Sequence, residues 1–316
     1  MWLEEKINLG NNMEVIKDND STIYILKDKS GKGIMKAYNV FPGVIITYDD
    51  FNMSNCYSSF NTDLDIFCIE HCKKGRIEWE FTDERYMYLG TGDFKIAEHN
   101  YDLKTFRFPL ENYYGISIIF HLEEASKSIN KLFDGFSIDL YKLKNKFCTS
   151  KKPFIMRADK SIEHIFSELY TIPKSIRDNY FKIKILELLL FLEVLEAPKN
   201  TIENSYLYRK QVEAAKEIKE FITSNLDKHF TIKQLSEKFN IPSTSMKIGF
   251  KSVYGISIYS YIRSYKMNIA AIMLSKDNES ISKIAGKLGY DNPSKFSAAF
   301  KSIVGKSPQE YRKSFV

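Results

Sequence analysis

The last quarter of the chain contains two near-copies of one segment. Phe250–Gly255 (FKSVYG) recurs as Phe300–Gly305 (FKSIVG), and the same offset of 50 residues relates Ser257 to Ser307. A duplicated helical unit presents two equivalent surfaces, and successive major grooves of duplex DNA lie about 34 Å apart. The repeat therefore predicts two similar helical heads, an arrangement typical of proteins that read double-stranded DNA.

Charge is unevenly distributed along the chain. The whole sequence carries 46 basic and 40 acidic residues, whereas residues 209–316 hold 19 basic and only 9 acidic ones. The C-terminal part is therefore at +10 and the remainder at −4. This asymmetry favours a polyanion as partner of the C-terminal part, although a solvated lysine-rich surface would give the same count.

Length and composition indicate a globular protein of two domains. The chain has 316 residues, of which 44% are hydrophobic and 27% charged, and about 150 residues per domain is usual. Neither the N-terminus nor the apolar stretch Ile185–Leu195 has the pattern of a signal peptide or a membrane span, so we expect no membrane partner. The cysteines match no disulfide framework, which favours reduced thiols and a cytoplasmic location. They are Cys56, Cys68, Cys72 and Cys148.

Residues 1–125 predict a β-rich domain. Segments such as Gly43–Tyr48 and Arg76–Phe81 are rich in β-branched and aromatic residues and are separated by turn signals. Thr82–Glu84 has the composition of a hairpin tip, and Gly90–Asp93 that of a tight turn. Several short strands at close spacing favour a small barrel or a sandwich.

Residues 126–195 predict helices. Apolar residues recur at helical spacing within Ile162–Leu169 and again within Asn179–Leu195. The apolar face of the second segment is wide enough for two partners, one of which could be the same helix of a second copy. We therefore expect a homodimer, the alternative being attachment to the β-domain alone. Residues 196–208 lose the periodicity and predict an interdomain linker.

The first copy of the repeat belongs to a helix-turn-helix pattern. Gln211–Asn225 predicts a first helix, and Thr231 with Gln234 forms a capping-box pattern that opens a second one. After a break, Ser243 is expected to cap the helix Ser243–Tyr254. A helix, a short turn and a second helix make the shape of a DNA-binding helix-turn-helix.

The second copy follows the same order. Ile281–Leu288 predicts a helix that Gly289 ends, and Asn292 with Pro293 begins the next helix. Ile258–Leu274 predicts a stiff helical connector between the two heads. The residues expected to face inward in the last long helix are Phe296, Phe300 and Ile303.

The inward positions leave an outward face on each recognition helix. In the first head this face holds Ser243, Thr244, Lys247, Ile248 and Lys251, and in the second Ser294, Lys295, Ser297, Ala298 and Lys301. Lysine can neutralise phosphate or reach guanine, and serine or threonine can contact phosphate or base edges. Since neither helix carries arginine, we expect apolar contacts and DNA shape to supply part of the specificity.

The C-terminal part resembles the DNA-binding domain of the AraC/XylS family of bacterial transcription regulators. The resemblance rests on Ile281–Ala285 (ISKIA), Gly289–Tyr290, Phe296, Phe300–Lys301, Gly305, Pro308 and Tyr311–Arg312. Met246–Gly255 resembles the branch that includes siderophore-uptake regulators, while Ile248, Gly249 and Lys266 depart from the commoner pattern.

The resemblance implies an α+β architecture. A cupin-like β-barrel (1–125) would bind a small-molecule effector, a helical segment (126–195) would form a homodimer, and a double helix-turn-helix domain (209–316) would bind DNA. An activator of this family would also contact RNA polymerase. The alternative is a DNA-binding protein whose β-domain contacts a protein partner instead of a small molecule.

Candidate effector residues, metal ligands and catalytic groups are sparse. Arg76, Glu78, Tyr88 and Arg107 are candidates to orient an effector in the implied barrel. His71 lies between Cys68 and Cys72, which could be soft-metal ligands, but alternation along a strand places His71 on the opposite face. We therefore predict no metal and no cofactor. Without a catalytic motif, we expect a binding protein rather than an enzyme.

Overall fold

The structure is a computed structural model of the 316-residue chain. It describes residues 7–8, 13–56, 59–60, 64–98, 103–132, 135, 137–148, 153–196, 206–276 and 279–315. The chain divides into two compact units, Met1–Tyr206 and Leu207–Val316, and each is described by itself. The division falls inside the predicted linker, most of which lies outside the described residues.

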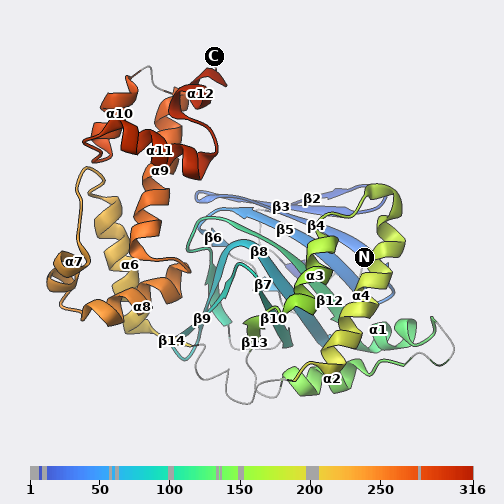
Figure 1. Cartoon of the computed structure of the whole chain (residues 1–316). Coiled ribbons are helices and arrows are strands. Elements are labelled where there is room, and N and C mark those ends of the chain that lie inside the picture. The colour runs from blue at the N-terminus through green and yellow to red at the C-terminus, as the bar shows by residue number, and fades with distance from the viewer. Residues whose placement is uncertain are drawn as a thin grey trace. The chain divides into compact units, whose positions relative to one another are not determined.

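The N-terminal unit is built on an antiparallel sheet (Figure 1). Its strands lie in the order β13 (Phe154–Arg157), β10 (Asp93–Glu98), β8 (Ile66–Phe81), β12 (Tyr113–His121), β5 (Val44–Asn52), β4 (Gly31–Phe41), β3 (Thr22–Asp28) and β2 (Met13–Lys17). The second half of the 16-residue strand β8 pairs with β9 (Arg85–Gly90) and β11 (Leu103–Arg107). Strand β8 thereby joins two parts of one domain.

Two further ladders complete the strands of this unit. Strand β11 also pairs with β6 (Asn55–Cys56), and β1 (Ile7–Asn8) pairs with β7 (Ser59–Phe60). In the described ranges no ladder joins β2 to β13, so the sheet is an open path rather than a closed ring. A β-rich domain followed by an all-helical region confirms the predicted α+β class.

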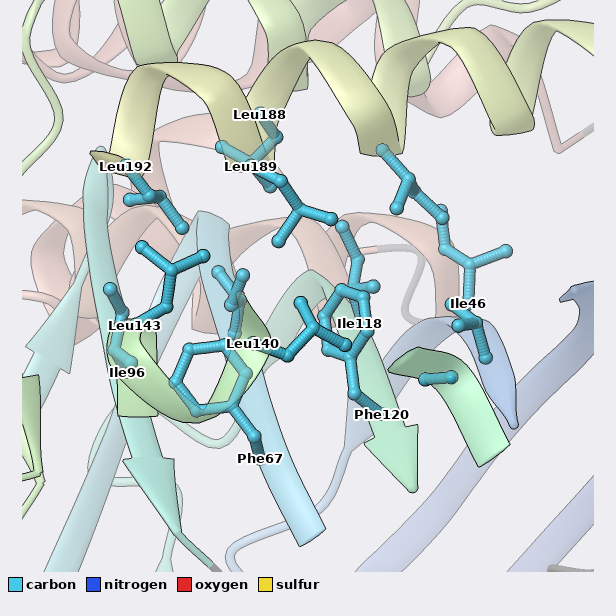
Figure 2. Close-up of a cluster of buried hydrophobic side chains, with 14 of the residues drawn as sticks. Ile46, Phe67, Ile96, Ile118, Phe120, Leu140, Leu143, Leu188, Leu189 and Leu192 are labelled. Atoms are coloured by element: carbon cyan, nitrogen blue, oxygen red, sulfur yellow. The ribbon is translucent and has the colours of Figure 1, made fainter. Parts of the chain in front are cut away.

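One face of the sheet carries the main core of the N-terminal unit. Register aligns Ile46, Ile118, Ile69 and Ile96 across β5, β12, β8 and β10, and all four are fully buried. The helices that cover them are α1 (Leu122–Ile129), α2 (Leu140–Phe147), α3 (Lys160–Leu169) and α4 (Arg177–Val194), with the short 3-10 turn η1 (Lys174–Ile176) before α4. Figure 2 shows leucines of α2 and α4 pointing at this isoleucine row.

The helical prediction for residues 126–195 is wrong at one place. Phe154–Arg157 forms strand β13, which pairs with β10 at the edge of the sheet. Four residues are too few to show the alternation of a strand, and a buried phenylalanine such as Phe154 is as common in a helix as in a strand. Only the pairing of this segment with β10 shows that it is a strand.

The C-terminal unit is helical after the two-residue strand β14 (Leu207–Tyr208). Its elements are α6 (Arg209–Thr223), α7 (Ile232–Phe239), α8 (Ser243–Tyr254), α9 (Ile258–Lys276), α10 (Ile281–Lys287), α11 (Pro293–Val304) and α12 (Pro308–Lys313). Helices α6–α8 make the first head, α10–α12 the second, and α9 connects them (Figure 1). Across the described part of the chain, no helix is both long and apolar enough to span a membrane.

Candidate nucleic-acid interface

The sequence repeat corresponds to two equivalent helices. Helices α8 and α11 have 12 residues each and begin 50 positions apart, at Ser243 and Pro293. Each ends at a glycine in the left-handed region, Gly255 with φ 77° and Gly305 with φ 86°. Glycine adopts this conformation without the Cβ clash that other residues meet, so it stops both helices at the same point.

The caps at the helix starts differ between the heads. Asn292 Oδ1 accepts hydrogen bonds from the backbone N–H groups of Ser294 (2.8 Å) and Lys295 (3.2 Å), as the sequence predicts for α11. In α8 the cap position is Pro242, and Ser243 is already helical. The prediction that Ser243 caps α8 is therefore wrong, because the proline occupies the position that a capping side chain needs.

The predicted capping box of the first head is confirmed. Thr231 Oγ1 accepts from the backbone N–H of Gln234 (3.2 Å), and the Gln234 side chain accepts from the backbone N–H of Thr231 (2.8 Å). The box fixes the start of α7, the helix that packs before α8.

Both heads are built around the same aromatic pair. The rings of Phe250 and Tyr261 lie 5.5 Å apart edge to face, and so do those of Phe300 and Tyr311. Both phenylalanines are fully buried. Ile303, predicted to face inward, is instead 36% exposed, so the prediction for this residue is wrong.

The residues predicted to face DNA lie on the surface. Thr244, Lys247, Ile248, Lys251, Ser294, Lys295, Ala298 and Lys301 are exposed, and Ser243 and Ser297 are half-buried. Ile248 is 61% exposed, which is unusual for so large an apolar side chain. Two helical faces with the predicted composition are thus open to a partner.

The lysines on these faces are available for a polyanion. Within the described ranges, no carboxylate lies within ion-pair distance of the lysines on these two faces. They are Lys247, Lys251, Lys295 and Lys301. Two other lysines of this unit are paired instead: Lys283 and Lys287 both reach Glu279, at 3.0 and 2.7 Å. Unpaired lysines on a recognition helix keep their full charge for phosphate.

The two faces are not chemically identical. The offset of 50 residues places Ser297 where the first head has Lys247, and Ala298 where it has Ile248. The first head therefore has a lysine and an isoleucine at the two positions where the second head has the small side chains of serine and alanine. Two heads with different side chains favour two different half-sites.

A compact junction connects the heads. His229 Nε2 donates to the carbonyl of Gly289, and Lys266, only 2% exposed, donates to the carbonyl of Lys228 at 3.3 Å. The loop after α6 thus contacts both the connector and the α10–α11 turn. Burial lowers the pKa of Lys266, and Asp227 opposes that shift. The junction holds the two recognition helices in one body.

The four predicted effector residues come together in the N-terminal unit, on one face of strands β8, β9 and β11. Tyr88 donates to Glu78 Oε2 at 2.7 Å, and the Arg76 guanidinium lies 5.0 Å from the centre of the Tyr88 ring. Arg107 lies 4.0 Å from Glu78 and 3.8 Å from Glu80. These charges are balanced by one another, so the group has the features of a structural network.

Sequence reasoning missed a second group, on the face of the main sheet opposite the helices. This group, here called the inner polar cluster, comprises Thr47 and Asp49 of β5, Ser117 of β12, Glu70 of β8 and Lys95 of β10. Ser117 donates to Asp49 Oδ2 at 2.7 Å, and Lys95 pairs with Glu70 at 2.6 Å. The polar residues at alternate positions of β5 were the available signal.

His71 lies on the opposite face of β8 from Cys68 and Cys72, as the sequence predicts. The His71 ring stacks on Phe166 of α3, with centroids 4.3 Å apart, and therefore faces the helices. Its nitrogens lie 3.1 Å from the Tyr170 hydroxyl and 3.3 Å from Glu163. The described residues contain no group of three or more His, Cys, Asp or Glu side chains placed to hold a metal ion.

The C-terminal unit matches a protein family. The model of a helix-turn-helix domain covers residues 235–314, which include α8, α9 and α11. The chain is 24% identical to the Msm operon regulatory protein of Streptococcus mutans over 283 residues, covering 85% of this chain and 98% of that protein. The C-terminal unit therefore carries an AraC-type helix-turn-helix domain, and the chain is similar along most of its length to an operon regulatory protein.

Other relatives match a smaller share of the chain. The arabinose operon regulatory protein of Salmonella typhimurium is 25% identical over 157 residues, 49% of this chain and 56% of that protein. Among solved structures, the C-terminal domain of the response regulator yesN from Fusobacterium nucleatum is 28% identical. The match covers 32% of this chain and 98% of the yesN domain, with a TM-score of 0.31. The proposed siderophore branch stays a prediction.

Proposed function

We propose that this AraC-type chain is a dimeric, effector-responsive regulator whose two heads enter successive major grooves. The observation that carries the proposal is the equivalence of α8 and α11, which have the same length, a glycine at the same end and the same aromatic pair in the core. Two such helices held by one junction suit a duplex, on which equivalent grooves recur about every 34 Å.

The outward residues divide into two roles. Lys247 and Lys295 lie within the first turns of their helices, the part of a recognition helix that approaches base edges. Lys251 and Lys301 lie in the last turns and are suited to phosphate contacts. Ile248 is suited to contact a thymine methyl group, which an apolar side chain can recognise.

The test begins with selection of binding sites from random duplex DNA by the full-length chain. Lys247→Ala and Lys295→Ala should each weaken binding to the selected site by about 1–3 kcal/mol if these lysines contact bases. Lys233→Ala is the matched control, because Lys233 is exposed on α7, outside the two faces, and its distance to Glu237 is 3.9 Å. Selection of no enriched sequence would contradict the proposal.

A readout of salt dependence separates the two roles. A lysine that contacts only phosphate should weaken binding equally on all sequences and reduce the salt slope by about one. A lysine that reads a base should instead relax preference at one position of the site. The outcome assigns each lysine, since the two effects differ in kind.

Helix α4 supports the proposed homodimer. Leu188, Leu189 and Leu192 point into the core, while Ile183 and Val194 on the other face are 59% and 76% exposed. Leu190, 46% exposed, continues the same stripe at a spacing of seven residues from Ile183. An apolar stripe on a helix already packed on one side suits a second copy of the helix.

Sedimentation tests the dimer. Leu190→Glu places a charge in the centre of the stripe and should shift the protein toward monomer, with the β-domain still folded. Lys182→Glu, a charge change on the same helix, serves as the control. Identical sedimentation of wild type and Leu190→Glu would exclude this stripe as the dimer contact.

Effector sensing by the β-domain is the remaining part of the proposal. Binding would act by shifting the population of states in which the heads are presented to DNA. The buried, unpartnered polar atoms of the inner polar cluster favour a small molecule over the alternative of a protein partner. Activation through RNA polymerase is proposed by resemblance, and transcription from a selected site in the presence and absence of the chain tests its sign.

A further inference from the structure

The inner polar cluster contains a carboxyl group without a cationic partner. Asp49 is 5% exposed, its Oδ2 accepts from Ser117, and its Oδ1 has no hydrogen-bond partner in the described part of the chain. The hydroxyl of Thr47, 1% exposed, is also unpartnered, and so is that of Tyr113, 2% exposed. Leaving such groups unsatisfied is destabilising, so they mark a place where a polar ligand gains affinity.

These atoms converge on one place. Register sets Asp49 opposite Gly115, and the Tyr113 hydroxyl lies 2.3 Å from where a Cβ of Gly115 would be. Ser117, two residues further along the same strand, reaches Asp49. Glycine at position 115 therefore lets the phenol of Tyr113 lie beside the carboxyl of Asp49.

The only buried ammonium of the cluster is already occupied. Lys95, 2% exposed, pairs with Glu70 at 2.6 Å and lies 4.5 Å from the centre of the Trp79 ring. When Asp49 is ionised, the cluster therefore has a net charge of −1. The Glu70 side chain remains 17% exposed, so the cluster reaches solvent at one edge.

We propose that the inner polar cluster is the effector site and that it takes a small organic cation, an alkylammonium or a guanidinium. This inference rests on the proposed effector-sensing function. A bound cation supplies the counter-charge that the buried carboxylate of Asp49 needs. An uncharged ligand does not supply it. An anion would meet the two carboxylates of Asp49 and Glu70.

Aromatic rings beside the carboxyl favour an organic cation over a metal ion. Phe51 lies two residues after Asp49 on the same face of β5, and its ring is 6.5 Å from that of Tyr113 and 4.9 Å from that of Phe108. Aromatic faces attract ammonium and guanidinium groups that are withdrawn from water. A carboxylate next to stacked aromatic rings therefore suits a ligand with a cationic group on a short alkyl chain.

Proton linkage gives the site a measurable signature. Burial raises the pKa of Asp49 from 3.8 to about 7, the hydrogen bond from Ser117 opposes the rise, and Glu70 adds to it. Burial also raises the pKa of the Cys68 thiol and of the Tyr113 and Tyr170 phenols. Those three groups stay neutral near pH 7, and the pKa of Asp49 lies there.

The experiment measures binding of matched probes to the full-length chain by calorimetry and thermal shift. The cations are 1,4-diaminobutane, butylamine and butylguanidine, and the neutral counterparts are 1,4-butanediol and butanol. We expect the cations to raise the melting temperature saturably and the alcohols to have no effect. Equal responses to a diamine and its diol, or none to any cation, would overturn the proposed ligand class.

Two adjacent carboxylates provide the matched variants. Asp49→Asn should weaken cation binding at least tenfold, whereas Asp50→Asn, at an exposed position on the opposite face of the same strand, should leave it unchanged. With a pKa of about 7, Asp49 is roughly one-tenth ionised at pH 6 and nine-tenths at pH 8, so affinity should fall about tenfold from pH 8 to pH 6. Affinity that is independent of pH, or retained by Asp49→Asn, would exclude Asp49.

DNA binding separates this inference from the proposed function. If cations bind through Asp49 but the chain selects no DNA sequence, the regulator proposal fails and the site stands. If the chain selects DNA but binds no cation, the site fails and the regulator stands. Folding of each variant is checked by its melting without ligand.

Discussion

Gly286 and Gly289 lie three residues apart at the end of α10, and alanine should have opposite effects at the two positions. A Cβ added to Gly286 would meet no atom within 4 Å, and alanine is favoured over glycine in a helix by about 0.8–1.0 kcal/mol. Gly286→Ala should therefore stabilise the second head by about 1 kcal/mol.

Gly289→Ala should destabilise the same head. Gly289 has a φ of +73°, and its added Cβ would lie 2.7 Å from the Asp227 carbonyl oxygen and 3.0 Å from the Asp227 carbonyl carbon. The left-handed conformation alone costs alanine about 1–2 kcal/mol. The backbone of Asp227 cannot easily move away, because His229 nearby donates to Gly289.

Hydrogen exchange measured by mass spectrometry on the full-length protein tests both changes. One to two kcal/mol corresponds to a factor of about 5–30, so amides of α10 and α11 should exchange about fivefold more slowly in Gly286→Ala and at least fivefold faster in Gly289→Ala. Peptides from the β-domain are the internal control. Changes of the same sign at both positions would refute the steric reasoning about the junction.

Two further predictions concern stability. Phe300→Ala removes a fully buried ring and should cost about 3–5 kcal/mol, seen as a lower melting temperature of the C-terminal unit; unchanged melting would contradict its inward position. Asp49 keeps in the folded state a proton that the unfolded chain releases above its pKa of 3.8, so its contribution to stability is lost progressively as pH rises toward about 7. Asp49→Asn should therefore gain stability relative to the wild type across that window, and parallel melting profiles of the two proteins from pH 4 to pH 8 would show that Asp49 is not the cause.

Local sequence signals were sufficient for the recognition helices. The capping box at Thr231, the offset of 50 residues, and Asn292 with Pro293 predicted where α7, α8 and α11 begin. Each signal acts within a few residues, so no knowledge of distant contacts is needed. The failed cap at Ser243 is also local, because Pro242 occupies the cap position and Ser243 is already the first helical residue.

Signals that depend on pairing were insufficient. Strand β13 is defined by its ladder with β10, which no four-residue pattern encodes. Arg76, Glu78 and Tyr88 lie on one face of the sheet, and their mutual contacts, which reduce their capacity to bind a ligand, depend on the register of β8 with β9.

The sequence by itself determined that the C-terminal part carries two copies of one helical head with lysines on the outward face, because helical periodicity and caps are local properties. Tertiary structure alone decided which polar residues of the N-terminal unit meet. Asp49, Glu70, Lys95 and Ser117 come from four strands, and only the register of those strands brings them together. A shift of one residue in any ladder would turn its side chain to the opposite face, and periodicity along one strand does not fix that register.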